Sequence, residues 1–324
     1  AQLVAINDRT PLPITSGSIG GLLDSRDGSI DAVIDRLDTL ARELIFGVNQ
    51  LHAVSQDATG LTEASAEVQI ASGDLIKAFN DTTNLSMKGL PAAPTSGTFT
   101  VHVWNPGSGA VEERLIEVDL NGFDASGAKT TASDTTPQQL ADALNGIPGL
   151  NASFDANGKL GITSDAGFEF SFEDDTSGVL GAMGVNAYFT GTSAANISVR
   201  QDLQESPTKL RLGRRENGQV IENATAKAIA NLQDKTIGTL GGVSLREYWS
   251  EGVQQVANDA NSAQTRTESA ALVRESLQAQ RDAVSGVSID EESINLLTFQ
   301  RQYQGSARVI SVADELLNTL IALI

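Results

Sequence analysis

The sequence contains no cysteine and only two histidines, which excludes several kinds of site chemistry. Without cysteine there can be no disulfide, thiolate ligand or thiol nucleophile. His52 and His102 lie far apart, so a histidine-rich metal site is excluded, and neither has a Ser and Asp spacing that indicates a catalytic triad. We expect no catalytic residue, no cofactor and no metal, and the chain is predicted not to be an enzyme. His52 is expected on the exposed, polar side of a helix.

Basic residues and long apolar runs are also scarce. Lys and Arg total 22 against 41 Asp and Glu, a net charge of −19. Nucleic acids and anionic membrane surfaces attract basic patches, so this balance argues against both as partners. No run of about 18 apolar residues exists, so membrane insertion is not expected. The sequence starts without Met and without a signal-peptide pattern, and we expect it to be part of a longer natural protein.

Three segments resemble functional motifs only in part. Residues 155–158 begin like a calcium loop, but Ala166 occupies the closing position, so a hairpin turn is predicted. Residues 127–130 end like a phosphate-binding loop but lack its correctly spaced first glycine. The acidic groups at 112–113 and 173–175 could suggest a glycosidase, but such runs usually form solvated faces, and that is the prediction here.

Heptad repeats of apolar residues predict three long helices. The first covers residues 18 to about 55, the second residues 246–284 and the third residues 288–324. The repeating positions are Leu23, Ile30, Leu37, Leu44 and Leu51 in the first helix, Trp249, Val256, Ala263, Ala270, Leu277 and Val284 in the second, and Ile289, Leu296, Tyr303, Ile310, Leu317 and Ile324 in the third.

The third helix is apolar up to the last residue of the sequence. Large apolar side chains left in water forgo roughly 1.5–3 kcal/mol each, so we expect another chain, or another part of this one, to cover them. The alternative is a helix packed on its own domain. The predicted assembly interface consists of Leu296, Phe299, Tyr303, Ile310, Leu317, Leu320 and Ile324.

The segment between the first two helices differs in composition. Residues 90–205 hold nine of the 15 aromatic residues and carry a local net charge of −11. Alternating residues predict strands at 97–104 and 115–120, Thr136-Pro137 starts a short helix, and Phe168, Phe170 and Phe172 are predicted to share one face of a core strand. The expected fold is therefore α+β: long coiled-coil-like helices forming a rod, with an inserted small β-rich domain.

The same composition shifts suggest six segments. We expect a helical rod segment at 1–60, a connector at 61–90, a β-rich outer domain at 91–205, a connector with a short helix at 206–245, a rod helix at 246–284 and a C-terminal axial-core helix at 285–324.

The C-terminal residues closely resemble a motif of flagellar rod, hook and hook-associated proteins. The resemblance covers residues 285–292, 295–297 and 299–310, with Gly305 where that motif usually has Ala. Residues 18–27, 49–53 and 231–234 resemble the middle of the first hook-associated proteins of the hook–filament junction. Parts of the β-rich insert are similar to repeats inserted in flagellins and filament-cap proteins. The sequence is identified as a member of the flagellar hook-associated family, without the amino-terminal helical segment of that family.

This resemblance implies a structural component of the bacterial flagellum that joins hook to filament through its helices. The implied partners are the hook protein, the second junction protein, a ring of further copies, and a flagellar export chaperone on the C-terminal helix. The implied location is extracellular, after export by the flagellar type III apparatus. Two alternatives stay open: another axial protein, such as a flagellin or the second junction protein, and a surface adhesin or glycan-binding module carried by the β-rich insert.

Overall fold

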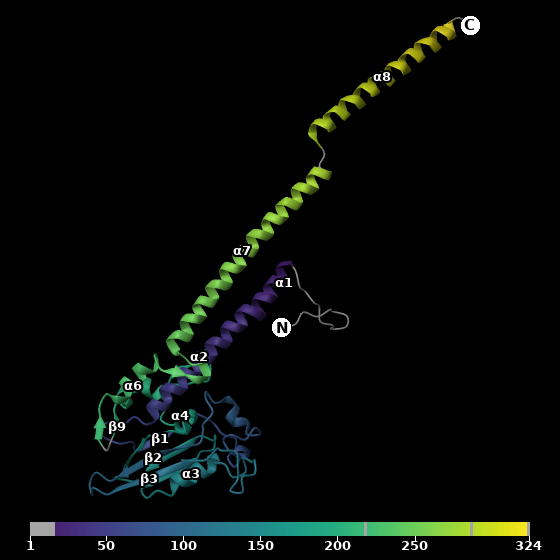
Figure 1. Cartoon of the computed structure of the whole chain (residues 1–324). Helices are drawn as coiled ribbons and strands as arrows, with labels where there is room; N and C mark the ends of the chain where they lie inside the picture. Colours follow the sequence, from purple (N-terminus) through teal and green to yellow (C-terminus); the bar gives the residue numbers. More distant parts are fainter. Residues whose placement is uncertain (1–16, 217–218, 286–287, 323–324) are drawn as a thin grey trace. The chain divides into compact units, whose positions relative to one another are not determined.

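The computed structural model describes residues 17–216, 219–285 and 288–322, shown in Figure 1. The chain divides into two compact units, residues 1–257 and 258–324. Helices and small antiparallel sheets occur together, so the predicted α+β class is confirmed. Among the described residues no helix combines the length and the apolar character needed to cross a membrane.

The first predicted helix is present, with one irregular turn. The α1 helix (Gly17–Asp24) continues into a π-helical turn, η1 (Ser25–Ile30), and then into α2 (Asp31–Ala53). The π-helical turn contains Gly28, and glycine is among the weakest helix formers. The last turns of α2 are buried in the first unit, so this helix ends inside the fold of that unit.

One antiparallel sheet has the strand order β3–β2–β6. It consists of β2 (Gly97–Trp104), β3 (Val111–Val118) and β6 (Glu169–Glu173). The bounds of β2 match the prediction, whereas β3 begins and ends before the predicted strand at 115–120. Its first residues, Val111 to Arg114, pair with β2 although their sequence does not alternate. Phe99 of β2 and both Phe170 and Phe172 of β6 point into one core and are fully buried. The Phe172 ring lies edge-on to Phe99 at 6.1 Å and to Phe170 at 5.5 Å between ring centres. Phe168, predicted to join them, is partly buried just before the strand.

A second sheet, with the order β1–β5–β4, packs on the same core. Its strands are β1 (Glu63–Ser65), β4 (Leu150–Phe154) and β5 (Leu160–Ser164). The predicted turn at 155–158 joins β4 to β5, and the Asp155 side chain accepts hydrogen bonds from the backbone of Asn157 and Lys159. The predicted hairpin turn is therefore confirmed.

The predicted short helix is α3 (Pro137–Asn145). Thr136 caps it: its hydroxyl accepts a hydrogen bond from the Gln139 backbone N–H at 3.1 Å, and its own N–H donates to the Gln139 side chain at 2.9 Å. Pro137 follows at the first helical position, where a missing N–H has no cost. The α4 helix (Val179–Met183) closes the core and packs against α2.

Smaller elements complete the first unit. They are η2 (Ser72–Asp74), η3 (Leu85–Gly89), the hairpins β7 (Phe189–Thr190) with β8 (Ser198–Val199), β9 (Arg214–Glu216) with β10 (Gln219–Ile221), and β11 (Thr236–Ile237) with β12 (Val243–Ser244), and the helices α5 (Gln201–Glu205), η4 (Pro207–Lys209), α6 (Ala224–Leu232) and η5 (Gly238–Leu240).

Two long helices follow, as predicted. The α7 helix (Leu245–Ser285) begins in the first unit and continues into the second, and α8 (Ile289–Ala322) belongs to the second. The Ser288 hydroxyl accepts a hydrogen bond from the Glu291 N–H at 3.4 Å and so caps the start of α8.

Candidate assembly surfaces

The end of α2 is held to the β-rich part by side-chain hydrogen bonds. The Asn49 carbonyl oxygen accepts from the backbone N–H of Tyr188 and of Phe189, and its amide donates to the Phe189 carbonyl at 2.9 Å. His52 lies one turn further on, with Nδ1 2.6 Å from the Asn186 carbonyl oxygen, and the Asn186 amide donates to the His52 carbonyl at 3.1 Å. These contacts fix the helix to the loop before β7.

The expectation that His52 lies on the surface is wrong. Its side chain is 0% exposed, because the face of α2 that carries Asn49 and His52 packs on the loop at 186–189. The contact to a carbonyl oxygen requires that Nδ1 carries the proton, and Nε2 is buried with no hydrogen-bond partner among the described residues. Burial lowers the pKa of His52 below its ordinary value, since the charged form loses its hydration, although the hydrogen bond to Asn186 acts in the opposite direction.

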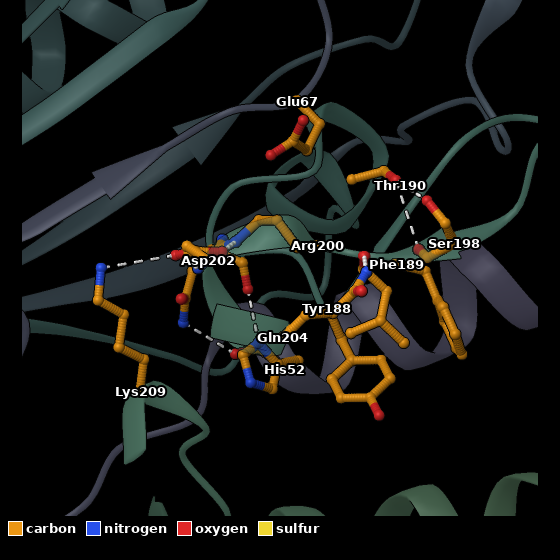
Figure 2. Close-up of polar contacts among 12 residues, drawn as sticks. His52, Glu67, Tyr188, Phe189, Thr190, Ser198, Arg200, Asp202, Gln204 and Lys209 are labelled. Atoms are coloured by element: carbon orange, nitrogen blue, oxygen red, sulfur yellow. Dashed lines mark hydrogen bonds and ion pairs between the residues drawn. The ribbon is translucent and has the colours of Figure 1, made fainter. Parts of the chain in front are cut away.

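A polar groove lies beside this junction, where α5 meets the β7–β8 hairpin. Figure 2 shows Arg200 directed at Asp202, with Nη2 2.9 Å from Oδ2, and Lys209 3.9 Å from the same carboxylate. The hydroxyl groups of Thr190 and Ser198 lie 2.7 Å apart across the hairpin. The groove has a volume of about 1030 Å³. Arg200, Asp202 and Lys209 are paired with one another, and Glu67 is paired with Lys159 outside the groove. Ion pairs of this kind are typical of a structural network rather than of a reactive centre.

His102 on β2 lies between two carboxylates. Its Nε2 is 2.7 Å from Glu173 Oε2 on β6, and its Nδ1 is 3.6 Å from Glu113 Oε2 on β3. Ser171 is opposite His102 in the sheet register, so serine, histidine and glutamate do meet on one sheet face. However, Ser171 is fully buried and its hydroxyl makes no hydrogen bond among the described residues. This arrangement supplies no activated nucleophile.

The predicted solvated face at 173–175 is only partly correct. Asp174 is exposed, whereas Glu173 and Asp175 are half-buried. Glu173 contacts His102, and Asp175 accepts hydrogen bonds from the backbone N–H of Gly178 and Leu180 at the start of α4. Burial raises the pKa of Asp175. In the part of the chain that the structure describes, no group of three or more His, Asp or Glu residues could hold a metal ion.

Within the first unit, α2 pairs with the first turns of α7. The Arg36 guanidinium donates to the Tyr248 carbonyl at 2.6 Å and lies 4.0 Å from the centre of the Tyr248 ring. It also contacts Glu251 at 3.2 Å. A largely apolar cavity of about 260 Å³ lies between the two helices. The predicted heptad residues Leu37, Trp249 and Val256 line it, together with Val33, Leu40 and Val253.

The predicted assembly interface lies on α8. Its described residues, Leu296, Phe299, Tyr303, Ile310, Leu317 and Leu320, have exposed side chains, with Tyr303 78% exposed, and Ile324 lies outside the described residues. Their spacing places them on one face of the helix. A second set of exposed apolar residues borders this face and was not predicted from the sequence: Val309, Val312 and Leu316. The same three- and four-residue spacing, started one position earlier, would have found them.

Comparisons with known proteins match both helical ends of the chain. A family model described as "Flagellar hook-associated protein FlgK helical domain" matches residues 4–68, and one described as "Flagellar basal body rod FlgEFG protein C-terminal" matches residues 278–323. The chain is 25% identical over 311 residues to Flagellar hook-associated protein 1 of Escherichia coli, and this match covers 95% of the chain and 49% of the relative.

Two further relatives agree. The protein of the same name from Salmonella typhimurium is 23% identical over 95% of the chain and 50% of its own length. The one from Bacillus subtilis is 24% identical over 93% of the chain and 58% of its own length. The chain is related to the flagellar hook-associated proteins. It spans about half the length of the hook-associated relatives that it matches.

Proposed function

We propose that this chain is part of a structural protein of the bacterial flagellum that joins hook to filament and performs no catalysis. The observation that carries the proposal is the match to hook-associated protein 1 along 95% of the chain, including both helical ends. The absence of an activated nucleophile or a metal-binding group among the described residues is compatible with a mechanical role.

We infer that α8 provides the main assembly contact, through the face that starts at Leu296. A helix with a wide apolar face is stabilised by packing against other apolar surfaces rather than by its own propensity. The partners proposed for it are further copies in a ring, the hook protein and the second junction protein. Before assembly, an export chaperone would cover the same face, since an exposed apolar patch of this size promotes aggregation. The same proposal includes that the protein is exported by the flagellar type III apparatus and then lies on the external flagellum.

Truncation after Gly286 tests the role of α8. The β-rich unit is expected to stay folded, because its core at Phe99, Phe170 and Phe172 lies entirely within the first unit. Junction assembly, chaperone binding and swimming are expected to be lost. The measurements are circular dichroism of the purified chain and motility of cells in which the truncated gene replaces the native one. Normal motility would refute the proposal.

A point substitution gives a sharper version of the same test. Leu317→Glu places a charge on the apolar face of α8, whereas Gln304→Glu adds the same charge on the opposite side of the helical wheel. The first variant is expected to abolish swimming and the second to preserve it. Equal motility of the two would contradict an assembly role for this face. As a second readout, amide protons of residues 288–322 should exchange fast in the unassembled protein, and strong protection in a monomer would argue against it.

A further inference from the structure

The outer edge of β3 is an unpaired strand edge. In the sheet order β3–β2–β6 this strand has a neighbour on one side only, and it runs from Val111 to Val118. Figure 1 shows it beyond β2 in the first unit. Val111 and Leu115 are 68% and 63% exposed although both are apolar. A strand edge of this length with exposed apolar side chains is a template for adding another strand.

The hydrogen-bond pattern shows which groups face this edge. The Asn105 N–H donates to the Ala110 carbonyl, so residue 110 is a hydrogen-bonded position in the pairing of β2 with β3. Such positions alternate along an antiparallel pair. Residues 112, 114, 116 and 118 therefore bond to β2, and residues 111, 113, 115 and 117 direct their N–H and C=O groups away from it. Among the described hydrogen bonds, none uses these outward backbone groups.

The side chains along the edge are complementary to themselves. When two copies of β3 run antiparallel with Glu113 opposite Glu113, Glu112 of each copy meets Arg114 of the other, and Val111 of each meets Leu115 of the other. The outward backbone groups then form about six hydrogen bonds between the copies. Opposite charges and apolar pairs both stabilise directly opposed positions. Within each copy Arg114 Nη2 lies 3.3 Å from Glu112 Oε1, so the contact between copies exchanges this exposed ion pair for one across the edge.

This register also contains one like-charge contact. The two Glu113 carboxylates face each other, which opposes the pairing. Sliding one strand by a single hydrogen-bonded step places Arg114 opposite Arg114 and separates Val111 from Leu115. A second step in the same direction places Glu113 of each copy opposite Glu117 of the other. A step in the opposite direction places Glu112 opposite Glu112. Of these registers, only the one centred on Glu113 places Arg114 opposite an acidic residue, so charge favours it.

We propose that β3 binds a second copy of this chain, edge to edge and antiparallel, in the register centred on Glu113. A contact of this kind is isologous: it joins two copies and cannot extend around a ring. The proposal therefore goes beyond the junction role proposed above. The edge is short compared with stable interfaces, and both copies are acidic, so the pairing is weak. We expect dimers to form at protein concentrations on the order of 100 µM and above.

Because the chain has no cysteine, the register can be tested with single introduced thiols. In the proposed register Glu113→Cys places its thiol opposite the same thiol of the other copy, within disulfide distance. Glu117→Cys, on the same edge and the same face, is opposite Gly109 and serves as the matched control. With oxidised glutathione as the thiol oxidant, the full-length Glu113→Cys chain is expected to form disulfide dimers about tenfold faster than the control, because pairing raises the local thiol concentration. Equal rates would overturn the proposal.

Two further variants fix the register and the charge contribution. Arg114→Cys should cross-link as slowly as the control, and faster cross-linking at 114 than at 113 would overturn the register. In the Glu113→Cys background, Glu112→Arg alone and Arg114→Glu alone should each slow dimer formation, and the combined swap should restore it. Failure of the swap to restore the rate would overturn the charge pairing. These readouts do not depend on α8, so they are independent of the motility tests.

Discussion

Large apolar side chains lie in opposite environments in the two units of this chain. In the first unit, Phe99, Phe170 and Phe172 are fully buried among two small sheets, α3 and α4. On α8, Leu296, Phe299 and their neighbours are exposed on one face. The first set stabilises the fold of its own unit, whereas the second can stabilise only what is packed against the helix. Substitutions of the same type in the two regions should therefore affect different properties.

The largest expected difference concerns the aromatic residues. Phe170→Ala removes a fully buried ring and should lower the free energy of unfolding by about 3–5 kcal/mol. Phe299→Ala, the matched change on α8, should leave the urea unfolding of the first unit unchanged and impair swimming. If Phe299→Ala shifted the unfolding midpoint of the first unit, the stability of that unit would depend on α8, which would contradict the comparison.

Much of the core of the first unit was predictable from residue pattern. Alternation placed β2 correctly, and Thr136-Pro137 marked the start of α3, because both signals act over a few neighbouring residues. His52 was misjudged for the opposite reason. Its burial depends on a loop at 186–189 that is far away in the sequence, and no local pattern reports such a contact.

Local sequence pattern is limited in the same way for the candidate assembly surfaces on α2 and α8. The heptad leucines of the first helix indicated a helix that pairs, yet the most buried residues of α2 are Ile45, Asn49, His52 and Ala53, on a neighbouring face. The sequence predicts the apolar face of α8 from its spacing alone. The role of that face in assembly, and the domain boundaries drawn from composition, stay predictions.

Two glycines provide the next comparison. A Cβ atom added at Gly181 of α4 would lie 2.7 Å from the Cα of Gln50, because α4 approaches the backbone of α2 closely. Gly181→Ala is therefore expected to lower the free energy of unfolding by about 1–3 kcal/mol. A Cβ atom added at Gly305 of α8 meets nothing within 4 Å. Gly305→Ala should therefore stabilise the helix by up to about 1 kcal/mol and increase its helicity. Chemical denaturation checks the first and circular dichroism the second; equal effects on unfolding would contradict the comparison.

His52 makes the stability of the first unit depend on pH. Its pKa in the folded chain is lowered, mainly by burial, from an unfolded value near 6.5. As the pH falls through about 6.5, the unfolded chain binds a proton that the folded chain does not, so stability decreases, by up to about 1.4 kcal/mol per pH unit. Melting curves between about pH 7.5 and about pH 5 should show this loss in the native chain.

The control for this effect keeps the hydrogen bond without the titration. His52→Gln can still donate to the Asn186 carbonyl but carries no group that titrates in this range. Its absolute stability should be lower, and its pH dependence above pH 5 should be flatter. An unchanged pH dependence would assign the effect to other groups. The α8 helix has no histidine, so its helicity should not follow the same curve.

The smallest expected difference concerns two helix caps of the same design. Thr136 makes both reciprocal bonds with Gln139 at the start of α3, whereas Ser288 accepts a single longer bond from Glu291 at the start of α8. Thr136→Ala should lower the free energy of unfolding of the first unit by about 1 kcal/mol, and Thr136→Ser should restore it. Ser288→Ala should not change that unfolding and should only speed amide exchange in the first turn of α8. Because each cap acts on the helix that it starts, an effect of Ser288→Ala on the unfolding of the β-rich core would mean that the N-terminal end of α8 contributes to the stability of the first unit.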